Sequence, residues 1–467
     1  MRCWTAERVA GAAGAALLRG GDPGAAGPQR VVVDSRAVAP GDLFVAIRGE
    51  RVDGGEFAVA ALRAGAWGVL AAPVWARATA TAAAAGEPIA VLAADDPVAA
   101  LGALARAWRR DLRADVIAVT GSVGKTSTKD LTAALIAPRR RVAASHANFN
   151  TEIGLPLELL AAPDGTEVLV LELAMRGFGQ IAELTAICEP DVGVITNIGP
   201  VHLEQTGSLE GVARAKGELL VGLRDGATAV VPHGEPLLEP YLRGSLDVVR
   251  FGAGGDVDFE DDPADGAPAG HRVVVAGTDR YELELPFGSR HNLLNTLAAV
   301  GAARAVGVRP SGRVDVRFGA LRGERIALAG DVTVVNDCYN ANPLSMRAAL
   351  DDLATQSPAG RRVAVLGDML ELGPAELEHH TEIGAHAAAS GVDVLIAVGP
   401  RSAAMLDHFD GEAHLAADAA EAAELARSLV GPGDVVLVKA SRGVGLEVVA
   451  EALAAQPQPQ PQRGGAG

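Results

Sequence analysis

The stretch 116–128, Val-Ile-Ala-Val-Thr-Gly-Ser-Val-Gly-Lys-Thr-Ser-Thr, holds the residues whose types and spacing point most directly to chemistry. A β-branched run ends at Thr120, a glycine loop follows, and Lys125 opens a helical pattern. This order predicts a phosphate-binding loop, because loop N–H groups and a helix N-terminus would face the anion. The Lys125 ammonium would reach the outer phosphates, and the Thr126 hydroxyl would ligate Mg²⁺.

The loop departs from the strict phosphate-loop pattern, which has a further glycine five residues before Gly124. Val119 stands at that position, so we interpret the loop as an atypical Gly-x-x-Gly-Lys-Thr form. A chance Gly-Lys-Thr is the alternative in a chain with 56 glycines, but the flanking strand and helix favour a nucleoside triphosphate site. The loop residues predicted to hold the nucleotide are Gly121, Ser122, Val123, Gly124, Lys125, Thr126 and Ser127.

Three further candidates follow in the same part of the chain. Glu172 ends the apolar run 168–171, and a carboxylate at the end of a strand beside a phosphate loop suits Mg²⁺. A solvated strand-end acid is an equal alternative. His202 lies just beyond a strand expected at 192–197, which makes it a better ligand candidate than most single histidines. Lys216 lies on what the pattern alone describes as an ordinary charged helix face.

A polar cluster, Asn-Asp-Cys-Tyr-Asn-Ala-Asn-Pro, occupies 336–343. Asp337 ends a predicted strand, and Asn342 followed by Pro343 is typical of a helix start. Polar residues this dense at a strand end indicate a site, although turn chemistry alone also explains them.

Short strands alternate with helical patterns over most of the 467 residues, which predicts an α/β fold with largely parallel sheets. The length suggests about three domains. We expect an N-terminal α/β domain at 1–94, a central domain at 95–322 with a parallel sheet like that of P-loop ATPases, and a C-terminal Rossmann-like α/β domain at 323–455. The Gln/Pro-rich stretch 456–467 is predicted to be disordered.

Composition excludes several classes of function. The formal net charge is −17, which argues against nucleic acid or an anionic membrane as a partner. Aromatic residues make up only 3% of the chain, so platforms for base stacking are not expected either. Three scattered cysteines fit a reducing cytoplasm, and no apolar run reaches the roughly 18 residues that span a bilayer. We therefore expect a cytoplasmic protein without membrane insertion.

Four stretches in this order, 120–127, 148–156, 290–295 and 337–346, resemble the motifs of the Mur ligases. These are ATP-dependent peptide ligases of bacterial cell-wall synthesis. The stretches 337–346 and 366–373 resemble those of members that join D-alanyl-D-alanine to UDP-N-acetylmuramoyl-tripeptide through an acyl phosphate. The Asp-Asn-Pro-Arg expected of the sister enzyme that adds the third residue does not occur.

The resemblance implies roles for the candidate residues. Glu172, His202 and Thr126 would hold Mg²⁺. Lys125 and Lys216 would join Glu172 and His202 in catalysis, and Lys216 matches a family lysine that is often carbamylated. A carbamate is an anion, which would explain a lysine near a metal. Further residues implied to bind ATP are Asn292, Asn295, Arg322 and Asp337.

The resemblance also implies a substrate surface and partners. Asp34, Ser35 and Arg36 match the motif that receives the uridine diphosphate end, so the N-terminal domain would bind UDP. Other residues implied to meet substrate are Asn148, Asn150, Thr151, Asn340, Asn342, Lys439, Ser441 and Arg442. ATP, Mg²⁺, UDP-MurNAc-tripeptide and D-Ala-D-Ala are the expected cofactors and partners, and the protein is expected to be a monomer. Thr151 and Ala440 depart from the family pattern, where asparagine and glycine are common.

Two alternatives remain at this point. A folylpolyglutamate synthetase would share the core reaction but would lack the block that carries Asp34, Ser35 and Arg36. A regulatory P-loop module would bind ATP and ligate nothing, which the array from Glu172 to Lys216 argues against.

Overall fold

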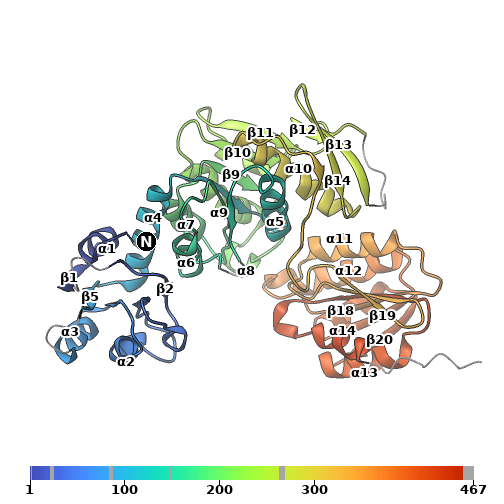
Figure 1. Cartoon of the computed structure of the whole chain (residues 1–467). Helices are drawn as coiled ribbons and strands as arrows, with labels where there is room; N and C mark the ends of the chain where they lie inside the picture. The colour runs from blue at the N-terminus through green and yellow to red at the C-terminus, as the bar shows by residue number, and fades with distance from the viewer. Residues whose placement is uncertain (2, 21–25, 84–87, 147–148, 262–268, 456–467) are drawn as a thin grey trace, which may run out of the picture.

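Three β-sheets follow one another along the chain and lie side by side (Figure 1). The computed structural model describes residues 1, 3–20, 26–83, 88–146, 149–261 and 269–455. Asn148 and the predicted tail 456–467 lie outside this described part. The predicted α/β fold with three sheets is confirmed, while the domain limits at 94 and 322 stay predictions.

The first sheet has five strands in the order β1-β5-β4-β3-β2. Strands β2 to β5 are parallel to their neighbours, and β1 pairs antiparallel with β5. Its elements are α1 (Ala6–Ala13), β1 (Ala16–Gly20), β2 (Val31–Val32), η1 (Ser35–Ala37), β3 (Leu43–Val45), η2 (Gly54–Phe57), α2 (Ala58–Arg63), β4 (Gly68–Ala71), α3 (Pro73–Ala82) and β5 (Ala90–Ala93).

The central sheet has ten strands in the order β15-β14-β13-β12-β11-β10-β9-β6-β8-β7. It is parallel around β6, as predicted, and continues into an antiparallel extension at β12, β13 and β14. Its strands are β6 (Asp115–Thr120), β7 (Val142–Ala144), β8 (Val168–Glu172), β9 (Val192–Ile195), β10 (Thr228–Pro232), β11 (Asp247–Phe251), β12 (Val257–Phe259), β13 (Gly270–Ala276), β14 (Asp279–Leu285) and β15 (Gly312–Arg313). Its helical elements are α4 (Pro97–Leu112), α5 (Lys125–Ile136), α6 (Gly154–Ala161), α7 (Gln180–Cys188), α8 (Leu203–Thr206), α9 (Leu209–Gly222), η3 (Pro236–Tyr241) and α10 (Arg290–Ala305).

The third sheet has six strands in the order β16-β17-β21-β18-β19-β20. All neighbours are parallel except β16, which pairs antiparallel with β17. Its elements are β16 (Glu324–Leu328), β17 (Val332–Asn336), α11 (Pro343–Ala354), β18 (Arg362–Gly367), η4 (Gly373–Ala375), α12 (Glu376–Ala389), β19 (Val394–Val398), η5 (Ser402–His408), β20 (Glu412–Ala416), α13 (Ala419–Leu429), β21 (Val435–Lys439), η6 (Arg442–Val444) and α14 (Glu447–Ala454).

Helix α4 joins the first two sheets through a shared apolar core. Pro97 and an Asp96 cap start the helix, and Leu104 and Trp108 on it are buried. The Trp108 ring meets Trp4 edge to face, with 5.6 Å between the ring centroids. One continuous apolar cluster therefore extends from the N-terminal residues to the central sheet.

The third sheet packs on cores of its own. Two apolar clusters lie on its two faces, and their buried members all fall between 332 and 453. The boundary between the central and third sheets is therefore the place where an open cleft forms. Within the described part of the chain, no helix is long and apolar enough to cross a membrane.

Candidate active site

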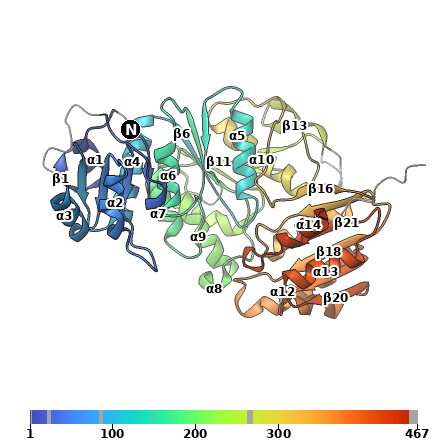
Figure 2. The ribbon, with the colours of Figure 1, turned by 60° about the horizontal axis from the view of Figure 1, so that its bottom comes forward.

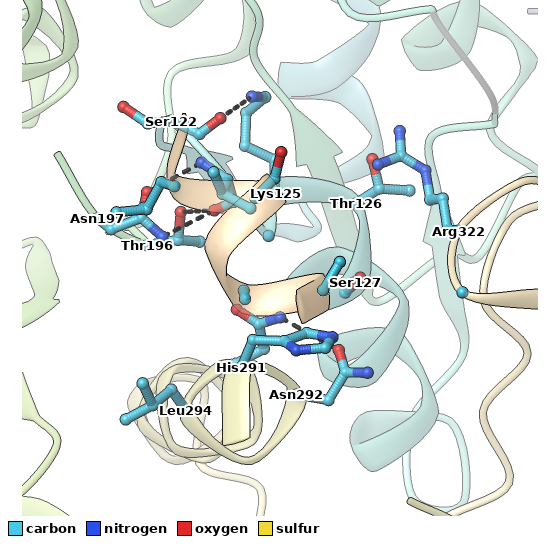
Figure 3. A pocket seen from close by; sticks show the side chains of 18 of the residues that line it. Ser122, Lys125, Thr126, Ser127, Thr196, Asn197, His291, Asn292, Leu294 and Arg322 are labelled. Carbon is cyan, nitrogen blue, oxygen red and sulfur yellow. Dashed lines mark hydrogen bonds between the residues drawn. The ribbon is translucent and has the colours of Figure 1, made fainter. Parts of the chain in front are cut away.

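A cleft of about 2160 Å³ lies between the central and third sheets. The carboxyl ends of β6, β8 and β9, the first turns of α5 and α10, and the exposed side of α11 line it. Figure 3 shows Lys125 and Thr126 at the start of α5, with His291 and Asn292 from α10 on one side and Arg322 on another.

The predicted phosphate loop connects β6 to α5 at the edge of this cleft. Gly121 and Gly124 have φ angles of +149° and +82°, a region that favours glycine. A Cβ atom on Gly121 would lie 1.8 Å from Oγ1 of Thr196, and one on Gly124 would lie 2.4 Å from Oδ1 of Asn295. Val119 is a buried residue of β6, so the loop begins after it and needs no glycine there.

Residues just after β9 hold the phosphate loop by hydrogen bonds to Val123. The carbonyl of Val123 accepts hydrogen bonds from Oγ1 of Thr196 at 2.5 Å and from Nδ2 of Asn197 at 3.0 Å. The Val123 N–H donates to Oδ1 of Asn197 at 2.9 Å. Thr196 and Asn197, which were not among the predicted site residues, therefore hold the cradle in shape (Figure 3).

Two ammonium groups converge on one carbonyl oxygen of the loop. Nζ of Lys125 and Nζ of Lys216 each donate to the Gly121 carbonyl at 2.9 Å. Lys216 is only 2% exposed, and no carboxylate of the described residues forms an ion pair with it. Burial, reinforced by the charge of Lys125, therefore lowers the pKa of Lys216 well below its ordinary value.

Lys125 is held in a more balanced environment. Burial lowers the pKa of its ammonium, and the carboxylate of Glu172 opposes that shift. Nζ of Lys125 also lies 3.4 Å from the carbonyl of Ser122, so the side chain folds back over its own loop.

Glu172 ends β8 as a buried carboxylate with two donors. Oγ1 of Thr126 donates to Oε2 at 2.6 Å, and Nδ2 of Asn150 donates to Oε1 at 3.0 Å. The N–H of Glu172 donates to Oγ of Ser145 at 3.0 Å. The structure therefore brings together the predicted Thr126, Glu172 and Asn150, and shows Ser145 as a support that the sequence analysis missed.

The oxygen ligands of this site suit Mg²⁺, but they are too few to bind a metal without water or phosphate. Thr126 and Glu172 present adjacent hydroxyl and carboxylate oxygens, which are hard ligands. Within the described residues, no three His, Cys, Asp or Glu side chains gather as a metal-binding group. Mg²⁺ commonly takes one or two carboxylates and completes its shell with water and phosphate oxygens, so a sparse protein set beside a phosphate cradle is consistent with it.

His202 lies at the same cleft, immediately before α8. Its Nδ1 lies 2.5 Å from Oε2 of Glu371, which belongs to the third sheet's domain. Burial lowers the pKa of His202, and the hydrogen bond to Glu371 opposes that shift.

The residues predicted to bind ATP beyond the loop lie on α10, just before β16 and after β17. Nδ2 of Asn295 donates to Oδ1 of Asn292 at 3.3 Å, so the two α10 amides form one row beside the phosphate loop. The Arg322 guanidinium lies 3.6 Å from the centre of the Tyr339 ring. Asp337 follows β17 and also lines the cleft.

Some predicted substrate residues have structural partners in the third domain. Lys439 is 2% exposed, and its Nζ donates to Oδ2 of Asp337 at 2.6 Å and to the carbonyl of Asn340 at 3.0 Å. Asn342 caps α11 in a capping box with Ser345. Lys439 and Asn342 thus order the loop 337–342 at the cleft, and their contact with substrate stays a prediction.

Ser441 and Arg442 are placed away from the main cleft. Oγ of Ser441 accepts from the N–H of Leu370 at 3.0 Å, and Arg442 pairs with Glu447 at 3.0 Å. Arg442 lines a second cavity of about 800 Å³, to which Arg322 and Thr126 also contribute. Thr151 lines the main cleft, as Asn150 does.

The predicted uridine diphosphate motif is separate from both cavities. Asp34 caps η1, and its carboxylate pairs with Arg36 at 2.8 Å. The hydrogen bond from Arg36 lowers the pKa of Asp34 to about 2. Asp34, Ser35 and Arg36 are absent from the residues that line the cavities described above, so the structure places them together but not beside the phosphate loop.

Lysine usage offers a signal that the sequence analysis missed. The chain has 41 lysines and arginines, of which only Lys125, Lys129, Lys216 and Lys439 are lysines. All four line one of the two cavities or contact the phosphate loop. Lys129, not predicted as a site residue, is buried and donates to the carbonyl of Ser145 at 2.5 Å.

Three family models match successive parts of the chain. They are described as Mur ligase family, catalytic domain, at residues 29–109; Mur ligase middle domain, at residues 119–303; and Mur ligase, glutamate ligase domain, at residues 321–442.

Curated relatives match nearly the whole chain. The UDP-N-acetylmuramoyl-tripeptide--D-alanyl-D-alanine ligase of Bacillus subtilis (strain 168) is 34% identical, over 91% of this chain and 93% of that protein. The ligase of the same name from Mycobacterium tuberculosis (strain H37Rv) is 37% identical, over 91% of this chain and 92% of that protein.

Solved structures show the same arrangement. MurF from Acinetobacter baumannii has a TM-score of 0.85 and 28% identity, covering 97% of this chain and 99% of its own. MurF ligase from Thermotoga maritima in complex with ADP has a TM-score of 0.78 and 30% identity, covering 91% of this chain and 97% of its own. E. coli FolC in complex with ADP shares the fold, at a TM-score of 0.56 and 20% identity, but covers only 75% of this chain and 92% of its own.

The buried Lys216 makes a prediction about stability. Its folded-state pKa lies well below the ordinary 10.5, so the unfolded chain binds more protons between the lowered value and 10.5. The wild type should therefore gain stability as the pH rises through that window, and Lys216→Met should lack this gain. Urea-unfolding midpoints between about pH 7 and pH 10, in CO₂-free buffer without nucleotide, measure it.

Arg214→Met is the matched control, because Arg214 is an exposed cation on the same helix. It should leave the pH dependence of the wild type unchanged. Parallel pH curves for wild type and Lys216→Met would show that Lys216 titrates normally.

Proposed function

The chain belongs to the Mur ligase family, and from that premise we propose that it joins D-alanyl-D-alanine to UDP-N-acetylmuramoyl-tripeptide with hydrolysis of ATP to ADP and phosphate. One observation carries the proposal. A phosphate cradle with Lys125, Thr126 and Glu172 faces a cleft whose opposite wall is formed by the third sheet's domain. The relatives that match over 91% of the chain bear the name of this reaction.

The reaction activates a carboxylate whose own leaving group would be oxide. An oxygen of the tripeptide carboxylate forms a bond to the γ-phosphorus, and the bond from that phosphorus to ADP breaks. The amine of D-alanyl-D-alanine then attacks the acyl carbon, the carbon–oxygen bond to phosphate breaks, and the amine loses its proton. ADP, phosphate and the new amide are the products.

Lys125 serves the first of these steps. Its ammonium leaves the Gly121 and Ser122 carbonyls and turns to the transferring phosphoryl group, where it neutralises developing charge. The loop N–H groups at the start of α5 hold the same phosphates.

Thr126, Glu172 and His202 would hold Mg²⁺, which when bound neutralises phosphate charge. Thr126 and Glu172 support this assignment by the hydrogen bond between them, and His202 supports it by lining the same cleft. Asn150 keeps the other oxygen of Glu172 occupied and so orients the carboxylate.

Lys216 is proposed to be a carbamate in the working enzyme. Its uncharged amine adds to CO₂, forming a nitrogen–carbon bond and releasing a proton. Burial supports this step because it favours the uncharged amine. The product is an anion, and it would attract the Lys125 ammonium, which contacts the same Gly121 carbonyl.

The remaining contacts are proposed from the motifs and the cleft. Asn292, Asn295, Arg322 and Asp337 would hold the adenosine part of ATP, and four of the residues lining the cleft, Asn150, Thr151, Asn340 and Asn342, would meet the peptide or D-alanyl-D-alanine. Asp34, Ser35 and Arg36 would receive the uridine diphosphate end. Asn148, Lys439, Ser441 and Arg442 stay predicted substrate residues.

We also propose a cytoplasmic monomer with domain limits near 94 and 322. Three scattered cysteines, described as free in the structure, support a reducing compartment. The breaks between the three sheets support the limits.

The two alternatives make different demands. A folate-directed ligase would not need the first sheet, which this chain has. MurF from Acinetobacter baumannii matches 97% of this chain, whereas FolC matches 75%. A regulatory ATP-binding module would not need Glu172, His202 and Lys216 around one cleft.

Release of ADP should depend on both UDP-MurNAc-tripeptide and D-alanyl-D-alanine, with the pentapeptide product seen by mass spectrometry. Lys125→Ala should lower the rate on the order of 10²-fold or more, because it removes the cation of the phosphate loop. Arg139→Ala, which removes an exposed cation just after the same helix, should leave the rate unchanged. ADP release without D-alanyl-D-alanine, or with folate in place of the UDP substrate, would refute the proposal.

The carbamate has a separate test. Because the chain has four lysines, ¹³C NMR with ¹³CO₂ should show one carbamate resonance that Lys216→Ala removes. Lys216→Ala should be largely inactive and partly rescued by short carboxylates, which can occupy the vacated anion position. Full activity of Lys216→Ala, or a resonance that persists in that variant, would contradict the carbamate.

A further inference from the structure

A single side-chain pair connects the predicted metal histidine to the third domain. Nδ1 of His202 lies 2.5 Å from Oε2 of Glu371. His202 precedes α8 of the central domain, and Glu371 follows β18 of the third domain. Figure 2 shows α8 beside the third domain, in agreement with the contact between α8 and η4.

The backbone is specialised at both ends of this contact. His202 has a φ angle of +53° and Glu371 one of +63°, a left-handed conformation that residues with a Cβ atom rarely adopt. The neighbouring Gly373 lies close to α8, since a Cβ atom there would be 3.6 Å from the N atom of Glu204. Two unfavourable backbone conformations thus aim the two side chains at each other across the domain boundary.

The contact with a carboxylate favours one tautomer of the His202 ring. An ionised carboxylate only accepts hydrogen bonds, so Nδ1 of His202 is the donor. In the neutral ring Nε2 then has a free lone pair, and no described residue is hydrogen-bonded to it. This is the tautomer in which Nε2 can ligate a metal.

We propose that Glu371 is a positioning residue, which holds His202 in the Nδ1–H tautomer and in the orientation that presents Nε2 to Mg²⁺. The inference rests on the proposed function, in which His202 is a metal ligand. Carboxylates that accept from the second nitrogen of a metal-binding histidine fix its ring and raise its basicity. Glu371 supplies this partner from a different domain.

A coupling between domain position and metal binding follows. The third domain packs on its own apolar clusters, so it can move without disturbing the core that the first two sheets share. When it moves away from α8, His202 loses the partner that fixes its tautomer. The metal site is therefore complete only while the third domain is docked.

An ordinary surface ion pair is the competing explanation. The Glu371 side chain is 40% exposed, and exposed pairs usually contribute little to stability. Such a pair would leave the metal affinity of the site unchanged when broken. The metal affinity therefore separates the explanations, and the tautomer shows how Glu371 acts.

The test compares Glu371→Ala with Glu412→Ala. Glu412 is the matched control, because it also contacts a histidine, His414, at 2.9 Å, but within the third domain. Mn²⁺ affinity is measured by electron paramagnetic resonance with a non-hydrolysable ATP analogue. Glu371→Ala should weaken Mn²⁺ binding about 10- to 100-fold, and Glu412→Ala should not change it. Glu371→Gln should retain part of the affinity, because its amide oxygen still accepts the Nδ1–H bond.

A spectroscopic readout without metal or nucleotide completes the test. ¹⁵N NMR of histidine-labelled protein, assigned with His202→Gln, should show the Nδ1–H tautomer of His202 in the wild type. Glu371→Ala should give a mixture of tautomers. An unchanged tautomer and an unchanged Mn²⁺ affinity in Glu371→Ala would overturn the role of Glu371.

His202→Gln distinguishes failure of the positioning role of Glu371 from failure of the metal-binding role of His202. If it weakens Mn²⁺ binding while Glu371→Ala does not, the positioning role alone fails. If it leaves Mn²⁺ binding unchanged, the metal role of His202 in the proposed function fails, and the role of Glu371 fails with it.

Discussion

The side-chain nitrogens of Lys125 and Lys216 share the Gly121 carbonyl, and the rest of the site depends on this arrangement. Thr196 and Asn295 approach Gly121 and Gly124 too closely for any side chain there, so the loop requires glycine at both positions. Lys125 and the buried Lys216 therefore lie together at the end of β6, and the carboxylate of Glu172 stabilises the charged form of Lys125. Nucleotide phosphates and a carbamate on Lys216 would each add an anion at this position.

The division of the molecule into one joined pair of sheets and one independent sheet follows from the packing. Helix α4 ties the first sheet to the central one through Trp4 and Trp108. The strands that precede residues 34–36 and the phosphate loop therefore pack on one continuous apolar core. The third domain contributes Asp337 to the lining of the cleft, and its Glu371 contacts His202 of the central domain. The residues proposed to act together are thus divided between the joined pair of sheets and a third domain with cores of its own.

Local sequence was sufficient for the elements whose signals are short-range. The glycine loop after β6, the acid that ends β8 and the Asn342 cap of α11 each lie in the predicted element. The Val119 departure is explained by its burial in the strand. Thr196, Asn197 and Ser145 could not be predicted, since their contacts join residues far apart in the chain.

The spacing of residues in the sequence did not predict which lysine side chains are buried or which partners they have. The helical pattern suggested a solvated face for Lys216, whereas its ammonium is buried against the loop. Lys439 was assigned to substrate by resemblance, and its charge is satisfied by Asp337. Glu371 lies in the stretch 366–373 that carried part of the resemblance, but its contact with His202 could not be predicted because His202 is on another domain. The scarcity of lysine in an arginine-rich chain was the one readable clue to Lys129.

Transfer of an oxygen atom tests the central claim most directly. UDP-MurNAc-tripeptide labelled with ¹⁸O in its terminal carboxylate would be ligated to D-alanyl-D-alanine, and the phosphate product examined by ³¹P NMR. An acyl phosphate requires one labelled oxygen to appear in inorganic phosphate, since the carbon–oxygen bond of the intermediate breaks. Unlabelled phosphate, or label found in AMP, would contradict phosphoryl transfer at this site.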